Sequence, residues 1–132
     1  MSMANVPKDL KYTREHEWAK QEGGRVRVGI TAYAQDQLGD VVFVELPKVG
    51  AKVTASKAFG VVESVKAVSD LFAPVSGEVV ETNAELTQKP EIVNADPYGK
   101  GWMIVVKPSN KTEWDRLLTA QQYEEFLTQA GH

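Results

Sequence analysis

The sequence predicts a mainly β protein, and three observations support that prediction. Short valine-rich runs recur from Leu10 to about Pro108, Gly and Pro separate them, and residues of helical character are confined to the margins. The chain has 132 residues, 42% hydrophobic and 25% charged, which is enough to bury a core without disulfides or zinc. We therefore expect a single domain over 1–132, with a core over about 10–108 and a helical segment over about 112–129.

The first elements are predicted from alternation and turn residues. Arg25–Ile30 alternates polar and apolar side chains, and the Gly23-Gly24 turn before it predicts a hairpin with Trp18 on the partner strand. Thr31 to Leu38 is predicted as a short helix, with Thr31 as its N-cap and Gly39 as the residue of positive φ that ends it.

Five more strands and two helices complete the expected order. The strands are expected at Val41–Leu46, Ala58–Val65, Ala67–Ala73, Gly77–Thr82 and Trp102–Lys107. Thr112 with Asp115, and Thr119 with Gln122, have the spacing of helix caps. These two helices should turn apolar side chains to the sheet, namely Trp114, Leu117, Leu118, Tyr123, Phe126 and Leu127. A faint repeat, Gly39-Asp40-Val41-Val42 and Gly77-Glu78-Val79-Val80, suggests two related β motifs.

The composition excludes several classes of function. Without cysteine, the chain has no thiol nucleophile and no cysteine ligand for zinc or an Fe–S cluster. Two histidines, His16 and His132, are too few for a histidine metal site or a triad, so no metal site is expected. The net charge is −3 and the basic residues are scattered, which argues against nucleic-acid binding. No apolar run, Val41–Val44 included, is long enough to cross a bilayer, and the N-terminus has no signal or transit pattern, so we expect a cytoplasmic protein without a membrane partner.

One segment differs from its surroundings, because a single lysine, Lys66, lies midway between two valine-rich runs. No Gly, Pro, Asn or Asp marks a turn beside it, so the pattern alone predicts one long strand with Lys66 facing solvent. Glu45, Glu63 and Asp70 are better explained as solvated strand carboxylates than as an acid–base pair, and His16 as an ordinary strand histidine than as a catalytic one.

Motifs over nearly the whole chain resemble the H-protein family of the glycine cleavage system. The block Glu63-Ser64-Val65-Lys66-Ala67 is the most specific of them, and all occur in the family's order and spacing. The other matching stretches are Leu10–Tyr12, His16–Trp18, Val28–Thr31, Ala34–Asp36, Leu38–Asp40, Val41–Pro47, Ala73–Val79, Asn94–Tyr98 and Gly101–Trp102. The resemblance implies a flattened barrel-sandwich hybrid of two antiparallel sheets, of the lipoyl and biotinyl carrier type, with short peripheral and C-terminal helices. It also implies a hairpin with Lys66 at its apex.

The resemblance implies a carrier and not an enzyme. Lys66 would be joined through its ε-amine to lipoic acid, as (R)-N6-lipoyllysine. The hairpin residues Glu63, Ser64, Val65 and Ala67 would be recognised by a lipoyl ligase or transferase. The small uncharged neighbours Val65 and Ala67 favour lipoyl over biotin, because methionines usually flank a biotinylated lysine.

The implied cycle involves three partner enzymes. The arm would accept an aminomethyl group from the P protein, a pyridoxal-phosphate glycine decarboxylase. It would present that group to the tetrahydrofolate-dependent T protein, an aminomethyltransferase, and would be reoxidised by the L protein, a dihydrolipoamide dehydrogenase. Tethering keeps the transferred group at high effective concentration.

The family also implies a cleft that shields the loaded arm. Glu17 and Asp70 are the expected carboxylates near the arm's amine, with Glu15 and His16 beside them. Gln37 stands where some members have a histidine. A monomer with transient contacts to its partners is expected.

Two alternatives stay open at this point. The first is an H-like protein that relays lipoyl groups to other enzymes. The second is an enzyme that uses Lys66 as a Schiff-base nucleophile, which would require a buried, desolvated lysine.

Overall fold

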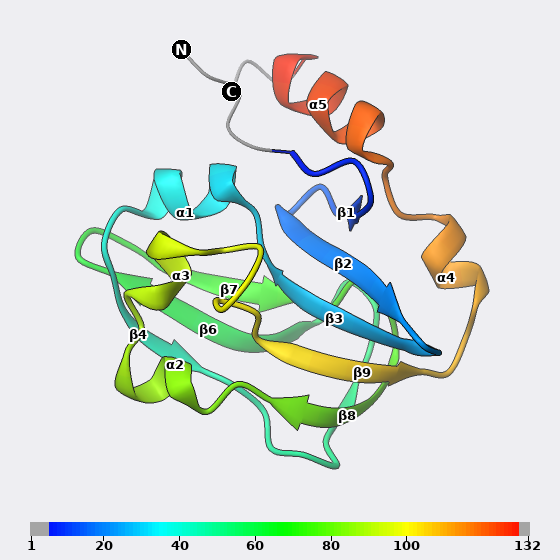
Figure 1. Cartoon of the computed structure of the whole chain (residues 1–132), viewed down its shortest axis with the longest axis horizontal. Coiled ribbons are helices and arrows are strands. Elements are labelled where there is room, and N and C mark those ends of the chain that lie inside the picture. Colours follow the sequence, from blue (N-terminus) through cyan, green and yellow to red (C-terminus); the bar gives the residue numbers. More distant parts are fainter. Residues whose placement is uncertain (1–5, 130–132) are drawn as a thin grey trace.

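The computed structural model describes residues 6–129 and contains two antiparallel sheets (Figure 1). The larger sheet has the strand order β1-β2-β3-β9-β8-β5 and the smaller one has the order β4-β6-β7. The strands are β1 (Lys11–Tyr12), β2 (Glu17–Glu22), β3 (Arg25–Ile30), β4 (Val41–Glu45), β5 (Lys52–Val53), β6 (Ala58–Ser64), β7 (Val68–Phe72), β8 (Gly77–Thr82) and β9 (Ile104–Pro108). The helices are α1 (Ala32–Leu38), α2 (Glu85–Gln88), α3 (Ile92–Ala95), α4 (Thr112–Asp115) and α5 (Ala120–Gln129).

The predicted fold class is confirmed, and most predicted elements agree with the structure to within one or two residues. The sequence prediction missed α2, α3, β1 and β5, each of which has four residues or fewer. No side chain caps α2 or α3. Leu86 and Val93 are fully buried, so packing against the sheets and not a local signal stabilises these two helices.

Helix α1 follows β3 directly and forms as predicted. The Thr31 hydroxyl accepts a hydrogen bond from Ala34 N at 3.1 Å, so Thr31 is the N-cap. Gly39 ends the helix with φ 77° and ψ −156°, a combination that is open essentially to glycine alone. The chain therefore turns sharply from α1 into β4.

The two Gly-acid-Val-Val motifs occupy similar places in the two sheets. The first leads into β4 and the second begins β8, and in each the register shifts at the last valine, between Val41 and Phe43 and between Val79 and Glu81. The shift in β4 leaves Val42 and Phe43 exposed beside β6.

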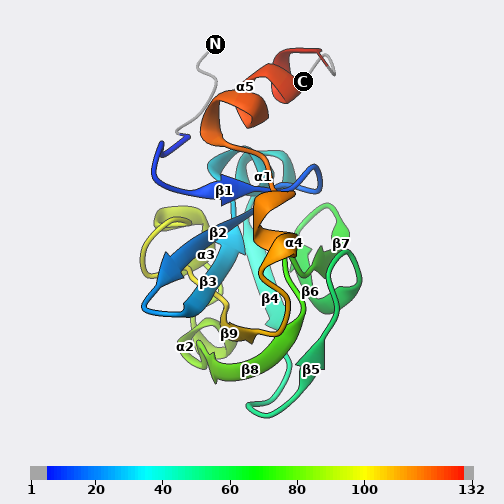
Figure 2. The same cartoon turned by 90° about the vertical axis from the view of Figure 1, so that its right-hand side faces the viewer.

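The core has two clusters inside the fold and a third under the C-terminal helix. Phe59 packs against both inner clusters and so connects them. The third cluster joins β1 and β2 to α5, and Figure 2 shows α5 lying above β1. Its buried members are Leu10, Tyr12, Trp18, Ala120, Tyr123 and Leu127.

The C-terminal helices confirm one predicted cap and correct the other. Thr119 N donates to Gln122 Oε1 at 2.9 Å and Gln122 N donates to Thr119 Oγ1 at 3.2 Å, which is a reciprocal capping box. Thr112 is not a cap, because the N-cap position of α4 is Lys111. Asn110 Oδ1 instead accepts from Thr112 N at 3.0 Å, and the apolar side chains of both helices pack inward as expected.

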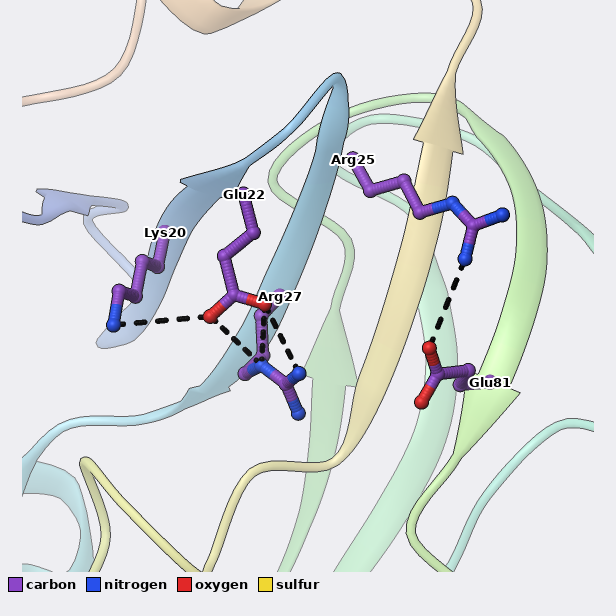
Figure 3. Close-up of polar contacts among 5 residues, drawn as sticks. All are labelled: Lys20, Glu22, Arg25, Arg27 and Glu81. Carbon is purple, nitrogen blue, oxygen red and sulfur yellow. Dashed lines mark hydrogen bonds and ion pairs between the residues drawn. The ribbon is translucent and has the colours of Figure 1, made fainter.

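The larger sheet has a face of paired charges (Figure 3). Arg27 and Lys20 both pair with Glu22, at 3.0 and 3.7 Å, and Arg25 pairs with Glu81 at 3.7 Å. The Arg27 guanidinium also stacks on Trp102, 4.5 Å from the ring centroid. Exposed pairs of this kind contribute little stability.

Candidate functional site

The segment around Lys66 is a hairpin and not the single long strand that the pattern alone predicts. Strands β6 and β7 pair antiparallel, with Glu63 opposite Val68, so Val65, Lys66 and Ala67 lie at the apex. In Figure 1 this loop projects at the left edge of the molecule, beside the connection from α1 to β4. Lys66 is exposed there.

Ser64 forms the turn that a glycine or asparagine usually forms. Its N donates to Ala67 O at 2.8 Å, while its Oγ accepts from Ala67 N at 3.1 Å and from Lys66 N at 3.3 Å. Serine hydroxyls are known to make such turns. Ser64 was therefore the signal for a turn that the pattern-based prediction missed.

One side of the hairpin carries exposed apolar side chains. Val65 is 70% exposed and Val68 69% exposed, and Val42 and Phe43 of β4 are exposed as well. The register puts Phe43, Glu63 and Val68 in one row across the three strands. We call Val42, Phe43, Val65 and Val68 the hairpin face, an apolar surface of the kind that marks interaction sites.

On its other side, the lysine stem lies against the end of α1. A Cβ atom built on Gly39 would lie 3.5 Å from Lys66 Cε. This is an ordinary van der Waals distance, so the stem passes close to the backbone that links α1 to β4.

A pocket of about 230 Å³ lies between α1, the loop before β2 and the hairpin strands. It brings together all four residues expected in a cleft, Glu15, His16, Glu17 and Asp70. Its wall also includes Gln37 and Leu38 of α1 and Val62 and Ser69 of the hairpin. The pocket is therefore lined by strands of the same hairpin that carries Lys66, and by the end of α1 next to Gly39.

Glu17 is the buried carboxylate of this pocket. Its side chain is not solvated, as that of an ordinary surface strand residue would be. It is only 1% exposed. Its carboxylate accepts from Thr13 Oγ1 at 2.6 Å and from Phe72 N at 3.1 Å. Burial raises the pKa of Glu17 to about 7, although both hydrogen bonds act to lower it. Within residues 6–129, no lysine or arginine forms an ion pair with it.

Asp70 and Glu15 are more open to solvent than Glu17. Asp70 is exposed and lies opposite Val61 in the row that also contains Glu45. Since side chains alternate along a strand, the pocket side of β7 belongs to Ser69 and Leu71, and Asp70 is at the rim. Glu15 is exposed in the loop before β2 and also borders a second cavity, of about 390 Å³, near Arg14 and Arg116.

His16 is not on a strand, contrary to expectation. It precedes β2 with φ 75°, in the left-handed region that few residues other than glycine adopt. Its Nδ1 lies 2.8 Å from Tyr123 Oη, which is 2.9 Å from Thr31 Oγ1. Tyr123 belongs to α5, so the C-terminal helix supports one wall of the pocket.

The described residues meet the requirements of neither a metal site nor a membrane-spanning helix. In the described part of the chain, no three His, Asp or Glu side chains are grouped to hold a metal ion. Nor is any described helix long and apolar enough to cross a membrane.

Comparison with known families and structures gives a consistent result. The family model for the glycine cleavage H-protein matches residues 10–130. A glycine cleavage system H protein of Geobacillus kaustophilus is 62% identical over 125 residues, which are 95% of this chain and 98% of that protein. The H protein of Bacillus subtilis is 59% identical over 122 residues, 92% of this chain and 96% of that protein.

A solved structure agrees with these sequence relatives. The crystal structure of a glycine cleavage system H protein from Mycobacterium marinum superposes with a TM-score of 0.83 at 44% identity. The match covers 96% of this chain and 100% of that one.

Proposed function

Because the chain belongs to the glycine cleavage H-protein family, we propose that Lys66 is the residue on which it carries lipoate. The chain is the lipoyl carrier of the glycine cleavage system and works with the other components of that multienzyme system. The observation that supports Lys66 is its place at the exposed apex of a hairpin whose strands also line a pocket with carboxylates.

The residues at the apex fit such an attachment. A ligase must reach the ε-amine, and Lys66 is exposed between the uncharged Val65 and Ala67. Ser64 holds the apex backbone through its hydroxyl, so the turn keeps its shape while the four carbons of the lysine stem stay free to rotate. When bound, lipoate supplies a disulfide ring that takes up and releases a small group at sulfur.

We assign the hairpin face to contact with the ligase and with the partner enzymes. Exposed valine and phenylalanine side chains around a single lysine give a surface that several enzymes can bind in turn. The proposed partners are the P, T and L proteins, and the chain itself catalyses no step.

The two alternatives are less well supported. A Schiff-base enzyme would need a buried lysine, whereas Lys66 is exposed. The relatives bear the name of the glycine cleavage system, which favours the shuttle over a lipoyl relay.

Two measurements on the full chain test this proposal. With lipoate, ATP and a lipoate ligase, intact mass should increase by one lipoyl group, and peptide mapping should locate it at Lys66. The modified chain should then support exchange of the glycine carboxyl group with bicarbonate by the P protein. Modification elsewhere would contradict the assignment of Lys66, and a modified but inert chain would favour the relay.

We further propose that Glu17 shields the amine of the loaded carrier. A cation arriving beside a buried carboxylate favours its ionised form and so lowers its pKa, which makes Glu17 a suitable counter-charge. The Glu17→Gln variant keeps an oxygen acceptor for Phe72 N but has no charge. We expect it to lose the bound amine roughly tenfold faster, the effect of one charge-assisted hydrogen bond.

Asp70→Asn is the matched comparison for this prediction. Because Asp70 is exposed at the rim, its effect should be clearly smaller than that of Glu17→Gln. The measurement is the rate of ammonia release from the loaded carrier in the absence of the T protein. Unchanged rates in both single variants and in the double variant would contradict a shielding role.

A further inference from the structure

We propose that Asn94 is a positioning residue for the lysine hairpin, acting through the backbone of residues 39–41. The inference rests on the attachment at Lys66 proposed above. Asn94 lies in α3, outside the hairpin and outside the pocket lining, and nothing in the proposed function uses it.

The Asn94 amide holds the connection between α1 and β4 at two points. Its Oδ1 accepts from Val41 N at 2.8 Å, and its Nδ2 donates to Gly39 O at 2.8 Å. The same Nδ2 donates to Gln35 Oε1 of α1 at 3.0 Å. One side chain thus binds the residues before and after Asp40.

Residues 39–41 lie beside residues 64–66 of the hairpin. A Cβ built on Gly39 would lie 3.5 Å from Lys66 Cε. Asp40 O accepts from Val65 N at 3.1 Å, and Val41 pairs with Ser64 between β4 and β6. Asn94 therefore holds both ends of residues 39–41, and residues 64–66 lie beside this segment.

This support matters because the apex has few other contacts. Val65, Lys66 and Ala67 are all exposed. Within residues 6–129, the hydrogen bond from Val65 N to Asp40 O joins the apex to the connection between α1 and β4, whereas those of Ser64 stay within the turn. If residues 39–41 move, the turn keeps its shape but loses its fixed direction.

The same segment also holds the other end of α1. Tyr98 Oη accepts from Ala32 N at 3.0 Å, at the first residue of the helix. Residues 94–98 therefore hold α1 at both ends, and α1 forms one wall of the pocket. These residues hold both the connection beside the lysine stem and the helix that lines the pocket.

The test compares Asn94→Ala with Asn83→Ala. Asn83 is a matched control, because its Nδ2 also donates to two backbone carbonyls, Lys100 O at 2.8 Å and Trp102 O at 2.7 Å, but neither of these bonds involves residues 39–41. Both variants should lose comparable stability. Only Asn94→Ala should speed amide exchange at Val65, a residue that Asn94 does not touch, by roughly tenfold beyond the change in global stability.

The second readout is lipoate attachment by a lipoate ligase at a temperature where each variant is folded. We expect kcat/KM to fall roughly fivefold to tenfold in Asn94→Ala and to stay within about twofold of wild type in Asn83→Ala. Asn94→Asp keeps the acceptor for Val41 N but loses both hydrogen bonds that Nδ2 donates, and it serves as a second variant if Asn94→Ala does not fold.

Unchanged Val65 exchange in Asn94→Ala, or an equal change in Asn83→Ala, would overturn the inference. Wild-type protein that is never modified at Lys66 would contradict the proposed attachment instead. The exchange measurement needs no lipoate, so the two failures can be told apart.

Discussion

A Lys66→Arg chain is expected to gain no lipoyl mass and to give no glycine–bicarbonate exchange above background. The guanidinium of arginine stays protonated and is not a nucleophile, so no amide can form. The substitution keeps the positive charge and a long stem at an exposed position, and the free energy of unfolding should change by no more than about 0.5 kcal/mol. Loss of function with an intact fold would assign the attachment to Lys66 itself.

Lys57→Arg is the control for this prediction. Lys57 is also exposed and directly precedes β6, so it shares the strand that leads to the hairpin. Its variant should be modified and should exchange like wild type. Lipoyl mass on Lys66→Arg, found by peptide mapping at any other lysine, would refute the assignment.

The free energy of unfolding is expected to fall with rising pH because of Glu17. The pKa of Glu17 is about 7 in the folded chain against an ordinary value of 4.5. Between these values the folded state holds a proton that the unfolded state has released, so stability decreases as pH rises through this window and levels off above it. The contribution of this one carboxyl amounts to about 3 kcal/mol.

The Glu17→Gln variant isolates that contribution. The wild-type free energy of unfolding minus that of Glu17→Gln, measured in urea at several pH values from 4 to 8, removes the other titrating groups. This difference should fall by about 3 kcal/mol over the range. Thr13→Val, which removes the hydroxyl donor to Glu17, should raise the pKa of Glu17 further in an NMR titration. A difference that is flat with pH would contradict the buried carboxyl described here.

The β architecture could be predicted from the sequence because its signals are local. Alternation in Arg25–Ile30, the Gly23-Gly24 turn and the Thr119–Gln122 capping box each depend on residues a few positions apart, and each forms as predicted. The short helices α2 and α3 could not be predicted in this way, since buried Leu86 and Val93 stabilise them through distant contacts.

The site shows the same division. The motif around Lys66 was visible in the sequence and led to the family, but the pattern at the apex favoured a strand, because Ser64 is a weaker turn signal than glycine. The left-handed conformation of His16 was also missed, because no neighbouring residue signals it. His16 instead contacts Thr31 and Tyr123, which are distant in the sequence.

By itself, the sequence determined the fold class, the family and the candidate lysine, because alternation, turn residues and motif order are properties of neighbouring positions. Only the tertiary structure decided what surrounds that lysine. Glu17 meets Phe72 across 55 positions, Asn94 meets Val41 across 53, and His16 meets Tyr123 across 107. The burial of Glu17 and the support of the hairpin follow from these long-range contacts, which form when the two sheets and α5 pack together.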